Sequence, residues 1–310
     1  MYRWNLLSES VERVGSLRID TGGNPTGGVV QLGGVLYGTT QSDGKTPGGK
    51  LTSGTVYRAN PLTGETSSVA AFDSSAGNGV IPQAGLTIIG PYLYGTNSAG
   101  GAGGSTDGTL FRVDPIFGLV NTIYFFHGEW PHGRLIPWGA YFYGTTRQGG
   151  WSGLGEVFRF NPSNGAVTFV ASILNGGHST SALTACGSLL YGTTEATVYK
   201  FDPEKGVLTV IANLDIGPAM SDLACDGSAV YGTTMRGGAY GHGSVFRIDT
   251  ATERLTTLVS FNGSNGDAPM GGLLVHDGYI YGTTRSGGGK AGGTLFRIAV
   301  PKAARRRSVS

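Results

Sequence analysis

The apolar and polar positions of the chain form short alternating runs that recur around one tetrapeptide, Tyr-Gly-Thr-Thr. The copies are Tyr37–Thr40, Tyr143–Thr146, Tyr191–Thr194, Tyr231–Thr234 and Tyr281–Thr284, with Tyr94–Asn97 as an altered copy. Successive copies stand roughly 40 to 57 residues apart, a period typical of solenoids, propellers and repeat arrays. No helical periodicity accompanies them. The pattern therefore predicts a repeat protein built from β-strands.

The first repeat shows the predicted unit. Its strands are expected at Val29–Leu32, Val35–Thr40, Thr55–Ala59 and Thr66–Phe72. These runs are rich in residues that suit a pleated surface. The turn at 60–64 contains a proline, which presets φ, and a glycine, which tolerates positive φ. We therefore predict a four-stranded antiparallel meander for each repeat.

A pair of an aromatic and a basic residue recurs in the third strand of each repeat. Because side chains alternate along a strand, we expect the aromatic ring in the core between units and the basic residue on the other face, as a repeated structural hydrogen-bond donor. The pairs are Tyr57-Arg58, Phe111-Arg112, Phe158-Arg159, Tyr199-Lys200, Phe246-Arg247 and Phe296-Arg297.

Six meanders in an open row would expose strand edges, and radial closure removes that problem. We therefore predict an all-β, six-bladed β-propeller of four-stranded antiparallel blades, because seven blades would need more strands than the chain offers. The last unit, Leu273–Ile298, lacks a fourth strand, whereas Tyr2–Trp4 resembles a third strand and Val11–Ile19 a fourth. The N-terminal strand is expected to complete the last blade. Residues 1–300 would then form one domain, followed by a basic tail at 301–310.

Composition excludes some classes of function. The 310 residues include 56 glycines, which suits short strands joined by tight turns. Only 14% of residues are charged and the net charge is +2, so we expect no nucleic-acid partner. No apolar stretch approaches the ~20 residues of a membrane helix, and the start MYRWNLLSES lacks the apolar run of a signal peptide.

The two cysteines, Cys186 and Cys225, precede consecutive YGTT copies and are one residue out of step with each other. On that register their side chains are expected to point to opposite faces of their sheets. We therefore expect buried free thiols rather than a disulfide or a metal-binding pair.

The pattern G-x-L-Y-G-T-T…G-G…G-T-V-F-R resembles the GloVer-type tandem repeat of bacterial surface proteins, and its glycine pairs resemble those of Kelch-like propellers. The resemblance extends from about Val29 to Ile298. It implies a propeller-like fold and an extracellular, cell-surface or virion-associated place, and it implies little about activity.

In a propeller, the loops between second and third strands share one face with the loops between blades, and ligands bind there. We call this the loop face. Its candidate ligand-binding residues are His127, Glu129, Trp130, His132, Arg134, Arg147, Trp151, His178, Arg236, His242 and Arg285. The group at 127–134 has donors for a metal, a sugar or a carboxylated ligand. Its H-x-E-x-x-H spacing lies in a Pro-Gly loop rather than on a helix, so we favour no metal site.

Signatures of common enzymes are missing: there is no phosphate-cradling loop, no nucleophile elbow and no EF-hand. We therefore favour a non-enzymatic binding or structural module without a cofactor, with a protein or a glycan at the loop face. An acidic partner is the candidate for the tail at Arg305–Arg307. The alternative is a carbohydrate-active enzyme, a lyase or hydrolase that would use His127, His132, His178, Arg134 and Arg147.

Overall fold

The computed structural model describes residues 2–5, 10–13, 15–18, 21–25, 27–42, 44, 52–101, 108–127, 129–290 and 292–301, so the tail with Arg305–Arg307 lies outside them. The chain splits into two compact units, Met1–Leu183 with Pro203–Leu208, and Thr184–Asp202 with Thr209–Ser310. The described residues form antiparallel strands and one 3-10 turn, η1 (Ser74–Ala76), and hold no helix that could cross a membrane.

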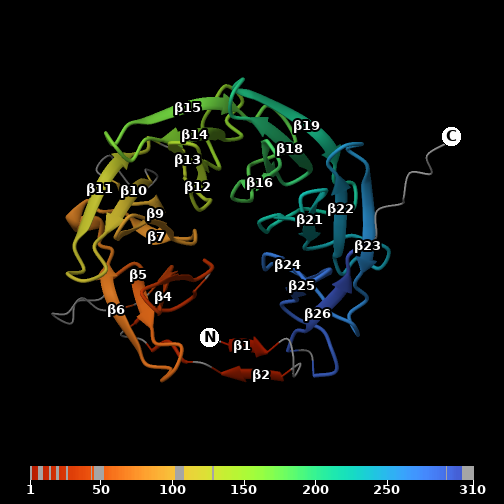
Figure 1. The fold of residues 1–310 in the computed structure, drawn as a ribbon, viewed down its shortest axis with the longest axis horizontal. Coiled ribbons are helices and arrows are strands. Elements are labelled where there is room, and N and C mark those ends of the chain that lie inside the picture. Colours follow the sequence, from red (N-terminus) through yellow and green to blue (C-terminus); the bar gives the residue numbers. More distant parts are fainter. Residues whose placement is uncertain are drawn as a thin grey trace. The chain divides into compact units, whose positions relative to one another are not determined.

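The first unit contains four sheets that follow one another along the chain (Figure 1). A two-stranded sheet comprises β1 (Tyr2–Asn5) and β2 (Ser10–Arg13). The next comprises β3 (Val30–Leu32), β4 (Val35–Thr40), β5 (Thr55–Ala59) and β6 (Thr66–Ala71). The third comprises β8 (Thr87–Ile89), β9 (Tyr92–Ala99), β10 (Thr109–Val113) and β11 (Val120–Phe125), and β7 (Val80–Pro82) also pairs with β9. The fourth comprises β12 (Ile136–Trp138), β13 (Tyr141–Thr145), β14 (Glu156–Phe160) and β15 (Val167–Ser172).

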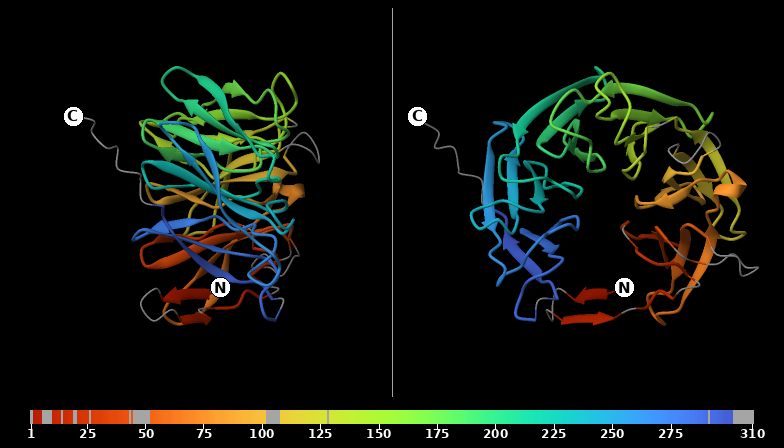
Figure 2. Two further views of the ribbon diagram at one scale, coloured as in Figure 1. Left: turned by 90° about the vertical axis from the view of Figure 1, so that its right-hand side faces the viewer. Right: turned by 180° about the vertical axis from the view of Figure 1, so that it is seen from behind.

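The second unit continues the series with three sheets, which are coloured from green-blue to blue in Figure 2. One sheet comprises β16 (Thr184–Cys186), β17 (Leu189–Thr193), β18 (Thr197–Asp202) and β19 (Val207–Asn213), and β19 crosses the division between the units. The next comprises β20 (Ala224–Cys225), β21 (Ala229–Thr234), β22 (Ser244–Asp249) and β23 (Leu255–Ser260). The last has three strands, β24 (Leu274–His276), β25 (Tyr279–Thr283) and β26 (Leu295–Ala299). The predicted four-stranded antiparallel meander is confirmed in five consecutive repeats, from β3 to β23, with β7 as an addition in the second of them.

The N-terminal strands pair differently from the prediction. β1 pairs with β2, Tyr2 opposite Arg13 and Trp4 opposite Val11, as third and fourth strands of a repeat do. They form a sheet of their own, however, and the sheet of β24, β25 and β26 has no fourth strand among the described residues. Completion of the last sheet by the N-terminal strand is therefore not confirmed.

The recurring aromatic residue of the third strand lies over the glycine of YGTT. In the third repeat, a Cβ added to Gly144 would lie 2.4 Å from Cζ of Phe158. The same ring-over-glycine contact occurs at Gly38, Gly95, Gly192, Gly232 and Gly282. Five of the six rings are fully buried and Phe296 is half-buried, so the predicted core role is confirmed. The glycine of YGTT therefore makes room for an aromatic ring, since any side chain there would collide with it.

The basic residue after the aromatic is occupied in two ways. Arg112 stacks on Tyr92 at 4.5 Å, and Arg159 and Arg297 stack on the tyrosines at the same position of their repeats. Lys200 and Arg247 donate instead to carboxylates, at 2.6 and 2.9 Å. The predicted structural role thus holds for these five residues, and three of them also stack on a tyrosine ring as a cation–π pair.

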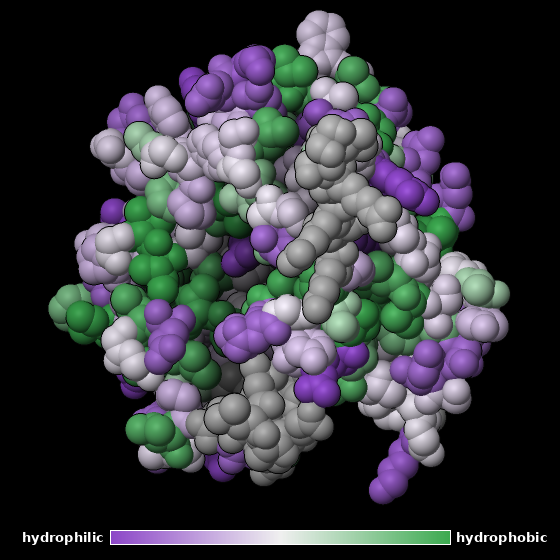
Figure 3. Space-filling model, turned by 45° about the vertical axis from the view of Figure 1, so that its right-hand side comes forward, coloured by the Kyte–Doolittle hydropathy of each residue, from purple (hydrophilic) through white to green (hydrophobic). Residues whose placement is uncertain are grey.

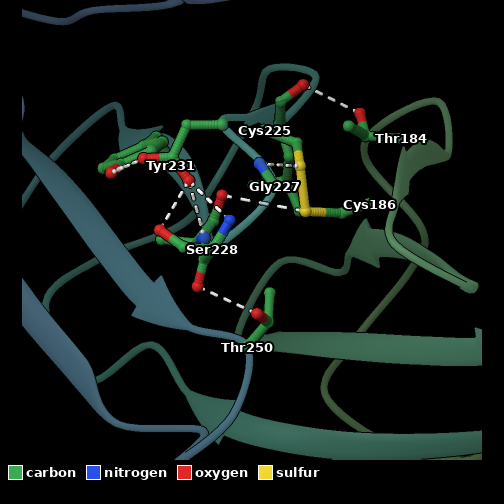
Figure 4. The surroundings of a disulfide bond; sticks show 10 residues. Thr184, Cys186, Cys225, Gly227, Ser228, Tyr231 and Thr250 are labelled. Atoms are coloured by element: carbon green, nitrogen blue, oxygen red, sulfur yellow. Dashed lines mark hydrogen bonds between the residues drawn. A yellow bond between two sulfur atoms is a disulfide. The ribbon is translucent and has the colours of Figure 1, made fainter. Parts of the chain in front are cut away.

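Cys186 and Cys225 form a disulfide with Cα atoms 5.7 Å apart, so the prediction of free thiols was wrong (Figure 4). The error lies in the geometry of stacked sheets. One face of a sheet packs against the opposite face of the next, so side chains one residue out of step meet across the interface. Leu223 and Val230 pack in the same core cluster as Cys186, which places β16 and β20 side by side.

Candidate functional site

The threonines of YGTT hold the loops of the third repeat in place. The hydroxyl of Thr145 donates to the carbonyl oxygen of Ser181 at 3.0 Å. The hydroxyl of Thr146 donates to the carbonyl oxygen of Gln148 at 2.8 Å and accepts the backbone N–H of Glu156 at 3.0 Å. These hydroxyls are therefore engaged in structural hydrogen bonds, and the motif itself has a structural role.

Two loops of the third repeat run alongside each other through backbone hydrogen bonds. Arg147 donates to the carbonyl oxygen of Trp130 at 2.8 Å, and Gln148 donates to that of Glu129 at 3.0 Å. His132 donates to the carbonyl oxygen of Thr145 at 3.1 Å. The structure therefore brings together the segment that carries His127, Glu129, Trp130 and His132 and the loop that begins at Arg147.

A pair of carboxylates lies where these loops meet the third strand. A Cβ on Gly149 would lie 2.7 Å from Cγ of Glu129 and 3.3 Å from Oε2 of Glu156, so both side chains approach the same point. Burial and, second, the charge of Glu129 raise the pKa of Glu156 above its usual value. Burial, followed by these two carboxylates, raises the pKa of the nearby Tyr124. Glu156 is therefore easier to protonate than an ordinary glutamate.

Trp151 projects from the loop that covers this pair. Its side chain is 93% exposed. Its backbone N–H donates to Oγ of Ser172 at 3.4 Å, and that hydroxyl lies 3.5 Å from Oε1 of Glu156. The loop is thereby tied to the end of β15: the Ser172 hydroxyl links the backbone of Trp151 to Glu156, and the indole itself is exposed.

The remaining candidates of the first unit have mostly structural partners. Nδ1 of His178 lies 3.0 Å from the carbonyl oxygen of Arg147. The stem of Arg134 lies near Gly85, in the preceding repeat, and its side chain is exposed. Trp130 has a φ of 44°, and Asn24, Ile81 and Ala268 are also left-handed at this position of their repeats. The unusual backbone at Trp130 is therefore a property of the repeat.

In the second unit, His242 contacts the carboxylate of Asp267, a residue that was not among the candidates from the sequence. Nδ1 of His242 lies 2.9 Å from Oδ1 of Asp267, and the hydroxyl of Ser286 donates to Oδ2 at 2.8 Å. These two bonds lower the pKa of Asp267. Because Ser286 donates to the aspartate and not to the histidine, the trio does not form a nucleophile with its base. Arg285 adjoins the trio through a backbone bond to Ala268, whereas Arg236 lies exposed in a separate loop.

No group of three or more His, Cys, Asp or Glu side chains suited to hold a metal ion occurs in the part of the chain that the structure describes. At the third-repeat loops lie two carboxylates, the phenol of Tyr124 and the exposed indole of Trp151.

Sequence reasoning missed Glu156, although a signal was present. The first residue of the third strand carries a hydroxyl in the other repeats, and this hydroxyl bonds to the end of the YGTT copy. Examples are Thr40 with Thr55 at 2.8 Å and Thr234 with Ser244 at 2.8 Å. Glu156 replaces this hydroxyl in the third repeat alone. A comparison of the repeats position by position would have found it.

A family model described as the Gloeobacter/Verrucomicrobia repeat matches residues 48–226 and 196–309. A comparison with curated proteins finds no match.

Solved structures support the fold. A protein from Bacteroides uniformis described as a 6-phosphogluconolactonase aligns with a TM-score of 0.62 and 16% identity, over 96% of this chain and 91% of that chain. A Bacteroides fragilis protein with the same description aligns with a TM-score of 0.61 and 15% identity, over 97% and 90%. An oligogalacturonate lyase solved with manganese aligns with a TM-score of 0.54 and 15% identity, over 87% and 74%. Such identities show the fold alone: an all-β, β-propeller-like repeat fold.

Proposed function

This chain belongs to the Gloeobacter/Verrucomicrobia repeat family, and we propose that it is a non-enzymatic binding module that recognises a glycan through the loops of its third repeat. Trp151 carries the proposal, because an indole that is 93% exposed at the tip of a tethered loop offers a flat apolar surface for a sugar ring. Glu129 and Glu156, which approach Gly149 in the same loop, supply acceptors for sugar hydroxyls.

The test is glycan-array screening followed by calorimetry on the whole chain. Trp151→Ala is expected to weaken binding by about tenfold or more, in the range of a binding hot spot, without changing the melting temperature. The matched control is Phe117→Ala, since Phe117 is also an exposed aromatic, at 74%, and lies in a turn of the second repeat. Failure of every glycan to bind, or binding that Trp151→Ala leaves unchanged, contradicts the proposal.

We place this module in an extracellular, cell-surface or virion-like assembly. The Cys186–Cys225 disulfide supports this place, because disulfides persist in oxidising compartments. On the face that Figure 3 draws, hydrophilic and hydrophobic residues are interspersed.

The tail at Arg305–Arg307 would dock on an acidic partner. We also propose that the sheets close as six blades, with the β1–β2 sheet beside the sheet of β24, β25 and β26, because closure would cover strand edges that are otherwise open.

The second candidate function is a glycoside hydrolase or polysaccharide lyase, and the raised pKa of Glu156 favours it specifically. A carboxyl whose pKa is raised by burial and by a neighbouring carboxylate is the arrangement expected of a general acid with its partner. Release of sugar from a panel of polysaccharides, abolished by Glu156→Gln while binding is retained, would decide for the enzyme. Binding without any release decides for the module.

A further inference from the structure

The first repeat departs from the others at its third-strand arginine. In the second, third and sixth repeats, this arginine stacks on the tyrosine that begins the second strand, with 4.5 to 4.9 Å between guanidinium carbon and ring centroid. In the fourth and fifth repeats, the cation pairs with Glu253 or Asp249. Five cations are thus engaged by a ring or by a carboxylate.

Arg58 has neither kind of partner among the described residues. Val35 stands where Tyr92, Tyr141 and Tyr279 stand in their repeats. Asn60 stands where Asp249 accepts from Arg247. The Arg58 side chain is exposed and donates through Nε to Oγ of Ser67 at 2.8 Å. Its two terminal nitrogens make no further contact with the described part of the chain.

A pocket of about 960 Å³ lies beside Arg58 and Val35, at the position where three other repeats have a ring. Three lining residues lie on one face of the sheet: Val35, Arg58 and Ser67. Arg58 pairs with Ser67 on one side and with Tyr37 on the other, so these side chains share a face. Val35 shares it too, because it precedes Tyr37 by two residues in the same strand. Arg18 lines the pocket from the segment 15–18. Its volume falls at the upper end of the range for small-molecule sites, roughly 300–1,000 Å³.

The wall that carries Arg18 is fixed to the sheet. The hydroxyl of Thr66 donates to the carbonyl oxygen of Ser16 at 3.0 Å, and a Cβ on Gly15 would lie 2.7 Å from the carbonyl oxygen of Gly64. The hydroxyl of Thr21 accepts the backbone N–H of Arg18 at 2.7 Å and donates to the carbonyl oxygen of Arg18 at 2.9 Å. The two arginines therefore stand on anchored backbone.

We propose that this pocket binds a small polyhydroxylated anion, a sugar acid or a sugar phosphate. The terminal nitrogens of Arg58 suit bidentate binding of a carboxylate or phosphate, and Arg18 adds a second positive charge. Ser16, Asn60, Thr63 and Ser67 supply hydroxyl and amide groups for the sugar hydroxyls. Glu65, the acidic residue of the lining, would disfavour large polyanions and accept from a hydroxyl.

The experiment is calorimetric titration of the full chain with glucuronate, glucose 6-phosphate, inorganic phosphate and glucose. We expect saturable binding of glucuronate or glucose 6-phosphate and none of glucose. Arg58→Ala is expected to weaken it about tenfold or more, the typical cost of a lost charged hydrogen bond. Val35→Tyr is expected to abolish it, because the new ring would stack on Arg58 as Tyr92 stacks on Arg112 and would take the place of the anion.

Arg112→Ala is the matched control, since it removes an arginine that is already engaged by a ring; it should leave the affinity unchanged. Trp151→Ala should also leave it unchanged, which separates this pocket from the third-repeat loops. Melting temperatures verify that each variant folds. Saturable binding of glucuronate points to a carboxylate, and binding of glucose 6-phosphate alone points to a phosphate. Binding of inorganic phosphate only, equal binding of glucose, no binding of any anion, or insensitivity to both Arg58→Ala and Val35→Tyr overturns the proposal.

Discussion

The disulfide between Cys186 and Cys225 joins two neighbouring sheets, and its removal measures how much it stabilises the chain. The cysteines are 39 residues apart in sequence. In the chain-entropy model, closing a loop of about 40 residues removes roughly 13 cal/mol/K from the unfolded state, or roughly 4 kcal/mol at 25 °C. Unfolding entropies near 2.1 cal/mol/K per residue then predict that the double variant Cys186→Ala/Cys225→Ala melts about 6 °C lower for a cooperative chain of this length.

Differential scanning calorimetry with and without reductant provides the assay. Reductant should lower the melting temperature of the native protein by the same amount and should not affect the double variant. Thr184→Val is a control that leaves the disulfide intact: it removes the hydroxyl that donates to Leu223 at 2.8 Å across the same interface, and should cost about 1 kcal/mol.

Thiol titration of the denatured protein shows whether the bond exists. The unreduced protein should contain no free thiol and the reduced protein two. Two free thiols before reduction, or a double variant that melts at the native temperature, would refute the reasoning. The first result would restore the prediction of free thiols, and the second would mean that the packing of β16 on β20 suffices without the bond.

Three further substitutions test the repeat. Gly232→Ala should lower the free energy of unfolding in urea by roughly 1–3 kcal/mol, because its Cβ would lie 2.4 Å from Cζ of Phe246. Glu156→Gln should raise the melting temperature at pH 7 and lose that advantage in acid: a carboxyl pKa raised by folding means that its ionisation destabilises the fold, and protonation removes this penalty. A hydrogen bond from Arg247 lowers the pKa of Asp249 from 3.8 to about 2, so its stabilisation should fade as pH falls through that interval, whereas Asp249→Asn should show no such loss in calorimetric melts.

The strands that alternate regularly could be predicted residue by residue. Val35–Thr40 and Thr55–Ala59 coincide with β4 and β5, because glycine turns and a proline-containing turn mark their ends. β7 could not be predicted, since Val80–Pro82 is short, contains a proline and pairs with β9 as an addition to the regular meander. The bulge that recurs between third and fourth strands, as at Val56 and Tyr57, likewise has no local sequence signal.

The candidate site could be predicted in part. The loops with Glu129 and Arg147 were expected on one face, and the structure joins them by backbone bonds. Glu156 was counted as a strand residue, and its burial and pairing with Glu129 depend on how the loop folds over it. The pocket at Arg58 could not be predicted for another reason. Valine in place of tyrosine at position 35 keeps the apolar pattern of its strand, and the residue that loses its stacking partner, Arg58, lies in the next strand.

Glu156 and Val35 share a property that bears on how a repeat protein acquires sites. Within a regular repeat the conserved residues satisfy one another: threonine hydroxyls bond to threonine hydroxyls, and arginines stack on tyrosines. A position that departs from the consensus changes which groups the repeat presents, because the neighbouring repeats hold the backbone in place. At Glu156 the departure introduces a carboxyl where a hydroxyl belongs, and at Val35 it removes a ring from an arginine. Binding capacity in this chain is therefore expected at single departures from the repeat, and substitutions that restore the consensus, such as Val35→Tyr and Glu156→Thr, should remove binding while preserving or increasing stability.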